Sequence, residues 1–110
     1  MKVLFDQGTP APLRKELKHH EVSTAHELGW STLENGELLS AAENAGFELF
    51  VTTDRNLQYQ QNLSDRKIAV VVLSTTSWPR IRAESSLMVS SINEVIPNSY
   101  VEINISDRTK

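Results

Sequence analysis

The stretch Ile68–Leu73, which reads Ile-Ala-Val-Val-Val-Leu, decides the fold class of this chain. It is rich in β-branched residues and has no polar alternation, which is typical of a strand buried on both faces of a parallel sheet. Two short apolar runs precede it, and each ends in an acid. Val3–Phe5 leads to Asp6, and Leu49–Thr53 leads to Asp54. We therefore expect several parallel strands, two of which end in a carboxylate.

Helical patterns separate these apolar runs. Thr9 and Pro10 are typical of a helix start, a second helix begins at Asn35 and stops at Gly46, and an amphipathic segment runs from Ile81 to Ile96. A short strand over residues 21–25 and an edge strand over residues 100–105 complete the alternation. This order predicts an α/β fold with a mainly parallel sheet and helices on both faces.

Composition limits the class of protein. The chain has 110 residues and a net charge of −3, and we expect one domain over residues 1–105 with a frayed tail at 106–110. With no cysteine, disulfides, cysteine-ligated zinc, iron–sulfur clusters and a cysteine nucleophile are excluded. No apolar run is long enough for a membrane span or a signal peptide. We expect a cytoplasmic protein that binds no membrane and does not coat nucleic acid by bulk charge.

The two strand-end acids are the leading candidates for chemistry. If their strands are neighbours, Asp6 and Asp54 meet at the carboxyl edge of the sheet, where ligands of open α/β sheets bind. Oxygen ligands of this kind favour Mg²⁺ or Mn²⁺. Glu37 would supply a third carboxylate, with Asn35 and Asn56 as neutral ligands. The alternative is that both aspartates simply cap the following helices.

Other residues are less specific. Trp78 with Arg80 and Arg82 follows the valine-rich strand, where an aromatic ring and two cations could hold a nucleic-acid strand. Equally, Trp78 could cover the sheet edge while Pro79 starts a helix. The glutamine-rich segment 58–62 adds hydrogen-bonding groups beside Asp54. The glycines match neither a P-loop nor a dinucleotide-binding motif.

Three segments together resemble a known family. The succession of Val3–Gln7, Glu34–Leu39 and Phe50–Asn56 is similar in order and spacing to the small bacterial PIN-like domains, relatives of the VapC-type toxins. The resemblance covers residues 2–96. It implies a Rossmann-like three-layer α/β/α fold, an acidic Mg²⁺ or Mn²⁺ site, ribonuclease activity and a small antitoxin as partner.

This chain has some, but not all, of the carboxylates that the family carries at its site. Asp6 and Asp54 match the acids that end the first and third strands of the family. Amides stand at three positions where the family tends to carry a carboxylate: Gln7, Asn35 and Asn56. In the second helix, Glu34 or Glu37 is the nearby substitute. An amide oxygen still ligates a metal but brings no negative charge.

The resulting hypothesis is a metal-dependent endoribonuclease acting on single-stranded or looped RNA. Its residues fall into three groups. Asp6, Asp54 and Glu37 would hold the metal and carry catalysis. Gln7, Asn35, Thr53 and Asn56 would support them, and Arg55, Arg80 and Arg82 would contact RNA.

Two other hypotheses stay open at this point. The amide replacements would suit a PIN-like module that has lost its chemistry and binds RNA or a small protein, through the glutamine-rich segment or the last helix. A phospho-accepting receiver domain also has acids at Asp6 and Asp54 and a hydroxyl at Ser74 or Thr75. However, the chain lacks a receiver's paired acids after the first strand and its lysine after the last strand. An edge strand on a small core is compatible with a homodimer.

Overall fold

The computed structural model describes residues 1–57, 62–63 and 66–105, and its centre is a five-stranded parallel sheet. The strands are β1 (Lys2–Phe5), β2 (Glu21–Thr24), β3 (Leu49–Thr52), β4 (Ala69–Leu73) and β5 (Tyr100–Ile103). A 3₁₀ helix, η1 (Ala11–Glu16), and the α-helices α1 (Asn35–Asn44), α3 (Trp78–Ala83) and α4 (Ser85–Asn93) connect them. Each neighbouring pair of strands is parallel, which confirms the predicted α/β class.

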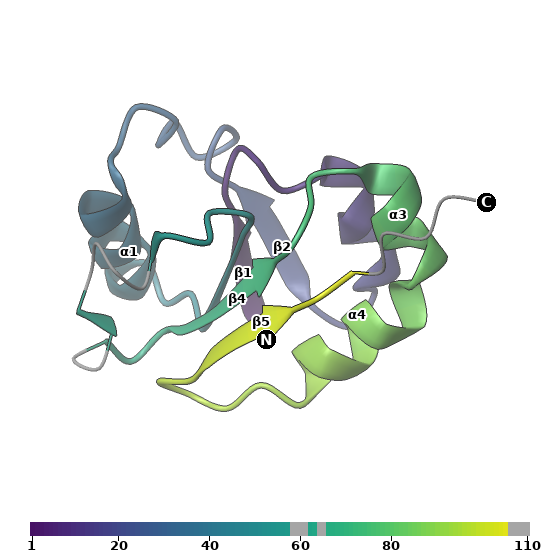
Figure 1. The fold of residues 1–110 in the computed structure, drawn as a ribbon. Coiled ribbons are helices and arrows are strands. Elements are labelled where there is room, and N and C mark those ends of the chain that lie inside the picture. The colour runs from purple at the N-terminus through teal and green to yellow at the C-terminus, as the bar shows by residue number, and fades with distance from the viewer. Residues whose placement is uncertain (58–61, 64–65, 106–110) are drawn as a thin grey trace.

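The helices form a layer on each side of the sheet. Alternate residues of a strand point to opposite faces, so β1 sends Val3 and Phe5 one way and Leu4 the other. The Val3 face packs against η1, α3 and α4, and the Leu4 face packs against α1. Figure 1 shows the strands between α1 on one side and α3 with α4 on the other. The three-layer α/β/α arrangement is thus present.

The strand order places the candidate site. Across the sheet the order is β2-β1-β3-β4-β5, so the chain leaves β1 toward one edge and later returns to add β3 on its other side. The order therefore reverses between β1 and β3, and in open α/β sheets ligands bind at the carboxyl ends of the two strands flanking such a point. Phe5 is in register with Val51. The residues that follow these two strands consequently share one edge.

Two predicted helices differ from the structure. The segment after Pro10 forms only the short 3₁₀ helix η1. Its N-cap is Pro10, which has no side-chain group to cap it, and the Thr9 side chain bonds to Asp6 instead. The helix expected over residues 81–96 is instead two helices, α3 and α4. They meet at Glu84, whose backbone (φ −120°, ψ 32°) leaves the helical region. Among the residues described, no helix has the length and apolar character needed to cross a bilayer.

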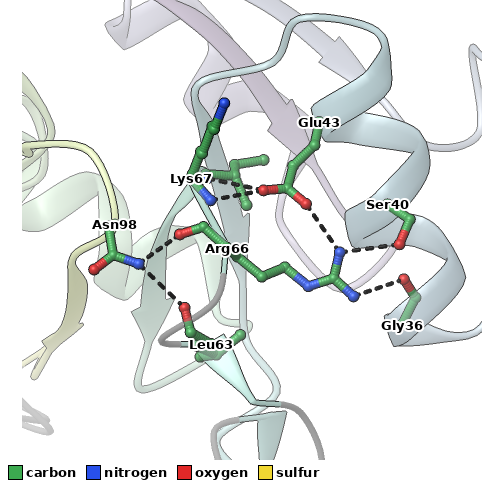
Figure 2. A network of polar contacts seen from close by, with 8 residues as sticks. Gly36, Ser40, Glu43, Leu63, Arg66, Lys67 and Asn98 are labelled. Atoms are coloured by element: carbon green, nitrogen blue, oxygen red, sulfur yellow. Dashed lines mark hydrogen bonds and ion pairs between the residues drawn. The ribbon is translucent and has the colours of Figure 1, made fainter.

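The connection between β3 and β4 is anchored to α1 by a polar network (Figure 2). The Arg66 guanidinium donates to Ser40 Oγ and Glu43 Oε1, both at 2.9 Å, and to the Gly36 carbonyl at 3.3 Å. Glu43 Oε2 accepts from the backbone N–H of Lys67 at 2.7 Å. This network fixes the chain where it enters β4. The predicted tail at 106–110 and residues 58–61 of the glutamine-rich segment lie outside the described residues.

Candidate metal and RNA site

Asp6 is held in place by the loop that follows it. It comes directly after β1, and its backbone N–H donates to the Val51 carbonyl of β3 at 3.1 Å. Its Oδ1 accepts from the backbone N–H groups of Gly8 and Thr9, both at 3.1 Å, and from the Thr9 hydroxyl at 2.9 Å. The carboxylate therefore organises its own loop, in the manner of an Asx turn.

A buried threonine links Asp6 to Asp54. Thr52 is 1% exposed and is the last residue of β3. Its hydroxyl donates to Asp6 Oδ2 and accepts from the backbone N–H of Asp54 at 3.0 Å. One side chain thus bridges the ends of β1 and β3, and both strand-end acids lie around it. The predicted meeting of Asp6 and Asp54 at this edge agrees with the structure.

Asn35 joins the same group from the first turn of α1. Its Nδ2 donates to Asp54 Oδ2 at 3.0 Å, while Asp54 Oδ1 accepts from the backbone N–H of Asn56 at 3.0 Å. Asn56 therefore contributes its backbone to Asp54, and its side chain is exposed. Asp6, Thr52, Asp54 and Asn35 form one connected set that draws on β1, β3 and α1.

Glu37 has a different contact. Its Oε1 accepts from the backbone N–H of Glu34 at 3.2 Å, which is half of a capping box at the start of α1. Its hydrogen bond is therefore to its own helix rather than to the aspartates. Over the described ranges, no three side chains of the histidine, aspartate or glutamate type cluster closely enough to hold a metal together.

The remaining predicted residues surround this centre. Gln7 Nε2 donates to the Ser31 carbonyl at 2.8 Å, so Gln7 ties the Asp6 loop to the loop before α1. Thr53 lies against Gly8, where a Cβ added to the glycine would meet Thr53 Oγ1 at 2.5 Å. Arg55 is exposed and directly follows Asp54. Arg80 and Arg82 belong to α3, which begins five residues after β4 ends.

Sequence reasoning missed the two hydroxyl groups that organise the site. Thr9 was expected to cap a helix, and Thr52 was expected only as a strand residue. The one available signal is the pair Thr52-Thr53 directly before Asp54, because a hydroxyl at the end of a buried strand needs a polar partner. That signal does not say which threonine faces Asp6.

The oxygen atoms at this edge are suitable ligands for a hard divalent cation. A carboxylate offers about four lone-pair positions for hydrogen bonds or metals. Among the residues that the structure describes, Asp54 accepts one hydrogen bond on each oxygen, whereas Asp6 accepts three on Oδ1 and one on Oδ2. Acceptor capacity therefore remains on both oxygens of Asp54 and on Asp6 Oδ2, and these are the ligand types that Mg²⁺ and Mn²⁺ prefer.

The local charge also favours a cation. Arg14 pairs with Glu27 and Arg66 pairs with Glu43, and neither of these ion pairs involves a site aspartate. Two carboxylates that follow neighbouring strands at one sheet edge, as Asp6 and Asp54 do, repel each other unless a cation or a proton reduces their charge. The edge between β1 and β3 is therefore an anionic site with unused oxygen ligands.

Comparison with protein-family models, with curated proteins and with solved structures gives no match to this chain. The site geometry and the family resemblance of the three segments are therefore the basis for inferring a function.

Proposed function

We propose that this protein is a metal-dependent endoribonuclease of the PIN-like class that cleaves single-stranded or looped RNA. The observation that carries the proposal is the bridge from Asp6 through Thr52 to Asp54 at the point where the strand order reverses. The family resemblance adds the toxin role and the small antitoxin partner to this proposal, and the sequence composition adds the cytoplasmic location.

The aspartates have unequal roles in the proposed site. Asp54 would be the main ligand of Mg²⁺ or Mn²⁺ because both of its oxygens keep acceptor capacity. Asp6 would add Oδ2 while its Oδ1 holds the loop. Asn35 fixes the rotamer of Asp54 through their 3.0 Å hydrogen bond. When bound, such an ion lowers the pKa of water and stabilises negative charge on a phosphodiester.

RNA would reach this edge along the exposed surface around it. Arg55 follows Asp54 directly and is exposed, so it is the nearest candidate in sequence for a phosphate contact. Arg80 and Arg82 on α3 would contact the backbone farther along the strand. Because the chain as a whole is acidic, these cations would act locally rather than through net charge.

A catalytically impaired PIN-like module is the second candidate, and a specific observation favours it. Glu37 caps α1, and amides occupy positions 35 and 56, so in the described part of the chain two carboxylates belong to the hydrogen-bonded set. Mg²⁺ is reluctant to lose its water ligands, and fewer carboxylates bind it more weakly. Such a module would bind RNA or a small antitoxin-like protein without cleaving RNA.

The strand order keeps a receiver domain as a third candidate, since receivers share the order seen here. Two observations count against it. Ser74 Oγ accepts from the backbone N–H of Ile105 at 2.8 Å and so already has a structural partner. The residues described after β5, Asn104 and Ile105, include no lysine. Incubation with a small phosphodonor should leave Asp54 unlabelled, and labelling would favour the receiver.

The central experiment is a calorimetric titration with Mn²⁺ of the wild type, Asp54→Asn and Asp6→Asn. Asp54→Asn should remove saturable binding and RNA cleavage while the protein stays folded. Asp6→Asn should also lower the free energy of unfolding, by roughly 1–3 kcal/mol, because an amide replaces one acceptor oxygen. Full Mn²⁺ binding and cleavage by Asp54→Asn would refute the proposed site.

Restoring a carboxylate gives a gain-of-function test. Asn56→Asp adds a negative charge beside Asp54 and should tighten Mn²⁺ binding at least severalfold, since ligand charge sets the affinity of such sites. Asn44→Asp is the matched control, because it adds the same charge near the end of α1, away from Asn35 at its start. Equal effects of the two variants would mean that net charge, and not the site, is responsible. Glu37→Gln should leave Mn²⁺ affinity unchanged if Glu37 serves only the helix.

A further inference from the structure

A pocket opens beside the proposed metal site and shares Asp6 with it. Its volume is about 180 Å³, roughly ten times the space that a single water needs. It lies between the Asp6 loop, the loop before α1 and the first turn of α1, and its walls include Gln7, Trp30, Ser31 and Asn35. A planar ring of modest size would fit such a space.

The walls of the pocket combine an aromatic ring with hydrogen-bonding groups. Trp30 is half-buried, and its ring packs edge-on against Phe47, with centroids 6.1 Å apart. The indole is thus held in a defined orientation on the pocket wall. Gln7 Nε2 is bonded to the Ser31 carbonyl, which leaves the Gln7 side-chain carbonyl as an acceptor. Together with the Asp6 carboxylate, the pocket offers mainly acceptors to a ligand.

The charge of the lining selects the kind of group that enters. Among the described residues, the lining of the pocket includes the Asp6 carboxylate but no lysine, arginine or histidine. A phosphate would therefore be repelled from the pocket. A neutral ring that presents N–H donors would be accepted, and exposed bases of single-stranded RNA stack on aromatic side chains in this way.

We propose that this pocket binds the base of the nucleotide next to the scissile phosphodiester, with a preference for bases that carry an exocyclic amino group. The inference deepens the proposed function, since it assumes that RNA is bound at Asp6 and Asp54. Adenine, cytosine and guanine can each donate an amino N–H to Asp6 or Gln7, whereas uracil has carbonyl oxygens in place of that group. Asn35 connects the two parts of the site, because it lines the pocket and bonds to Asp54.

NMR of the full chain in EDTA tests the pocket separately from metal binding. The protein has two tryptophans, and Trp78→Phe assigns the indole N–H signal of Trp30, which reports on the pocket. Cytidine monophosphate should shift the Trp30 signal saturably. Uridine monophosphate should bind about fivefold or more weakly, and ribose phosphate should cause no shift.

A pair of matched variants locates the binding. Ser31 and Thr32 are adjacent and both exposed, but only Ser31 lines the pocket. Ser31→Tyr should obstruct it and weaken cytidine monophosphate binding at least fivefold, whereas Thr32→Tyr should have no effect. Absence of a Trp30 shift, an equal response to ribose phosphate, or equal effects of the two variants would overturn the inference.

The outcomes also separate the pocket from the catalytic proposal. If Trp30 responds to cytidine monophosphate but the protein binds no Mn²⁺ and cleaves no RNA, the pocket stands and the proposed ribonuclease fails. If Mn²⁺-dependent cleavage occurs without a Trp30 response, the ribonuclease stands and the pocket assignment fails.

Discussion

Glu43→Gln is the substitution whose effect on stability follows most directly from the contacts. Glu43 lies on α1, and its carboxylate is bound on both oxygens. Oε1 accepts from Arg66 at 2.9 Å, and Oε2 accepts from the backbone N–H groups of Lys67 at 2.7 Å and Ile68 at 3.3 Å. The Arg66 and Glu43 side chains are only 19% and 24% exposed. This ion pair is therefore less screened by solvent than a surface pair.

The size of the effect can be derived from these bonds. In Glu43→Gln the side-chain carbonyl can still accept from Lys67 and Ile68, but the amide NH₂ then faces the Arg66 guanidinium, donor against donor. A hydrogen bond to a charged group contributes about 1.5–3 kcal/mol. Allowing for the remaining exposure, we expect a loss of about 1–2 kcal/mol, or a fall of roughly 4–10 °C in Tm for a domain of this size. Urea unfolding at pH 7 measures the free energy directly.

The pH dependence supplies an independent check. Burial acts to raise the pKa of Glu43, but hydrogen bonds from Arg66, Lys67 and Ile68 together outweigh it and hold the pKa below its ordinary value of 4.5. A lowered pKa stabilises the fold above the unfolded pKa, and this contribution is lost as the pH falls through the folded value. The difference between wild type and Glu43→Gln should thus be complete above about pH 5 and shrink below pH 4.5.

The exposed Glu94 provides the matched control, since Glu94→Gln makes the same chemical change without removing such a network. Its effect on the free energy of unfolding should stay within about 0.5 kcal/mol. The reasoning would be refuted by a Glu43→Gln effect no larger than that of the control. It would also be refuted by a difference from wild type that is the same at pH 7 and at pH 3.5.

Two further predictions concern the loop beside the site and an exposed ion pair. Gly8→Ala should destabilise the protein by roughly 1–3 kcal/mol in urea unfolding, because the added Cβ would lie 2.5 Å from Thr53 Oγ1. Thr53→Ala should relieve much of that loss in the double variant, and simple additivity would contradict the steric reason. Arg14→Gln should raise the pKa of Glu27 from about 2 toward 4.5 in an NMR titration, because the Arg14 hydrogen bond is the largest cause of the lowered value. An unchanged Glu27 pKa would show that this bond is absent in solution.

The strands at the centre of the sheet could be predicted because burial on both faces leaves a strong composition signal. Every residue of β3 and β4 is buried, and the sequence of each is almost wholly apolar. The break between α3 and α4 leaves no comparable signal in the sequence. Ile81, Met88 and Ile92 all face the same core, so their spacing is compatible with one continuous helix, and the change of direction at Glu84 is a property of the backbone.

The strand-end acids could also be predicted as neighbours, since parallel strands bring their carboxyl ends to one edge. The role of Glu37 could not be predicted in this way. An acid in the first turn of a helix is typical of a capping box and equally of a metal ligand, and sequence spacing is the same for both. The structure gives Glu37 the bond to the Glu34 backbone. What decides between the two roles is the direction of a side chain, which depends on tertiary packing.

Because Glu37 caps α1, the proposed site would need metal ligands from its substrate. With Glu37 capping α1, the protein offers Asp54 and one oxygen of Asp6 as charged ligands, fewer than a divalent ion usually takes from oxygen donors. The phosphodiester of a bound RNA would have to provide further oxygens. Mn²⁺ affinity should therefore increase when a non-cleavable RNA is present, and RNA affinity should increase with Mn²⁺ by the same factor, because coupling between two ligands is reciprocal. Equal Mn²⁺ affinity with and without RNA would mean that the ion and the phosphate do not share the Asp54 site.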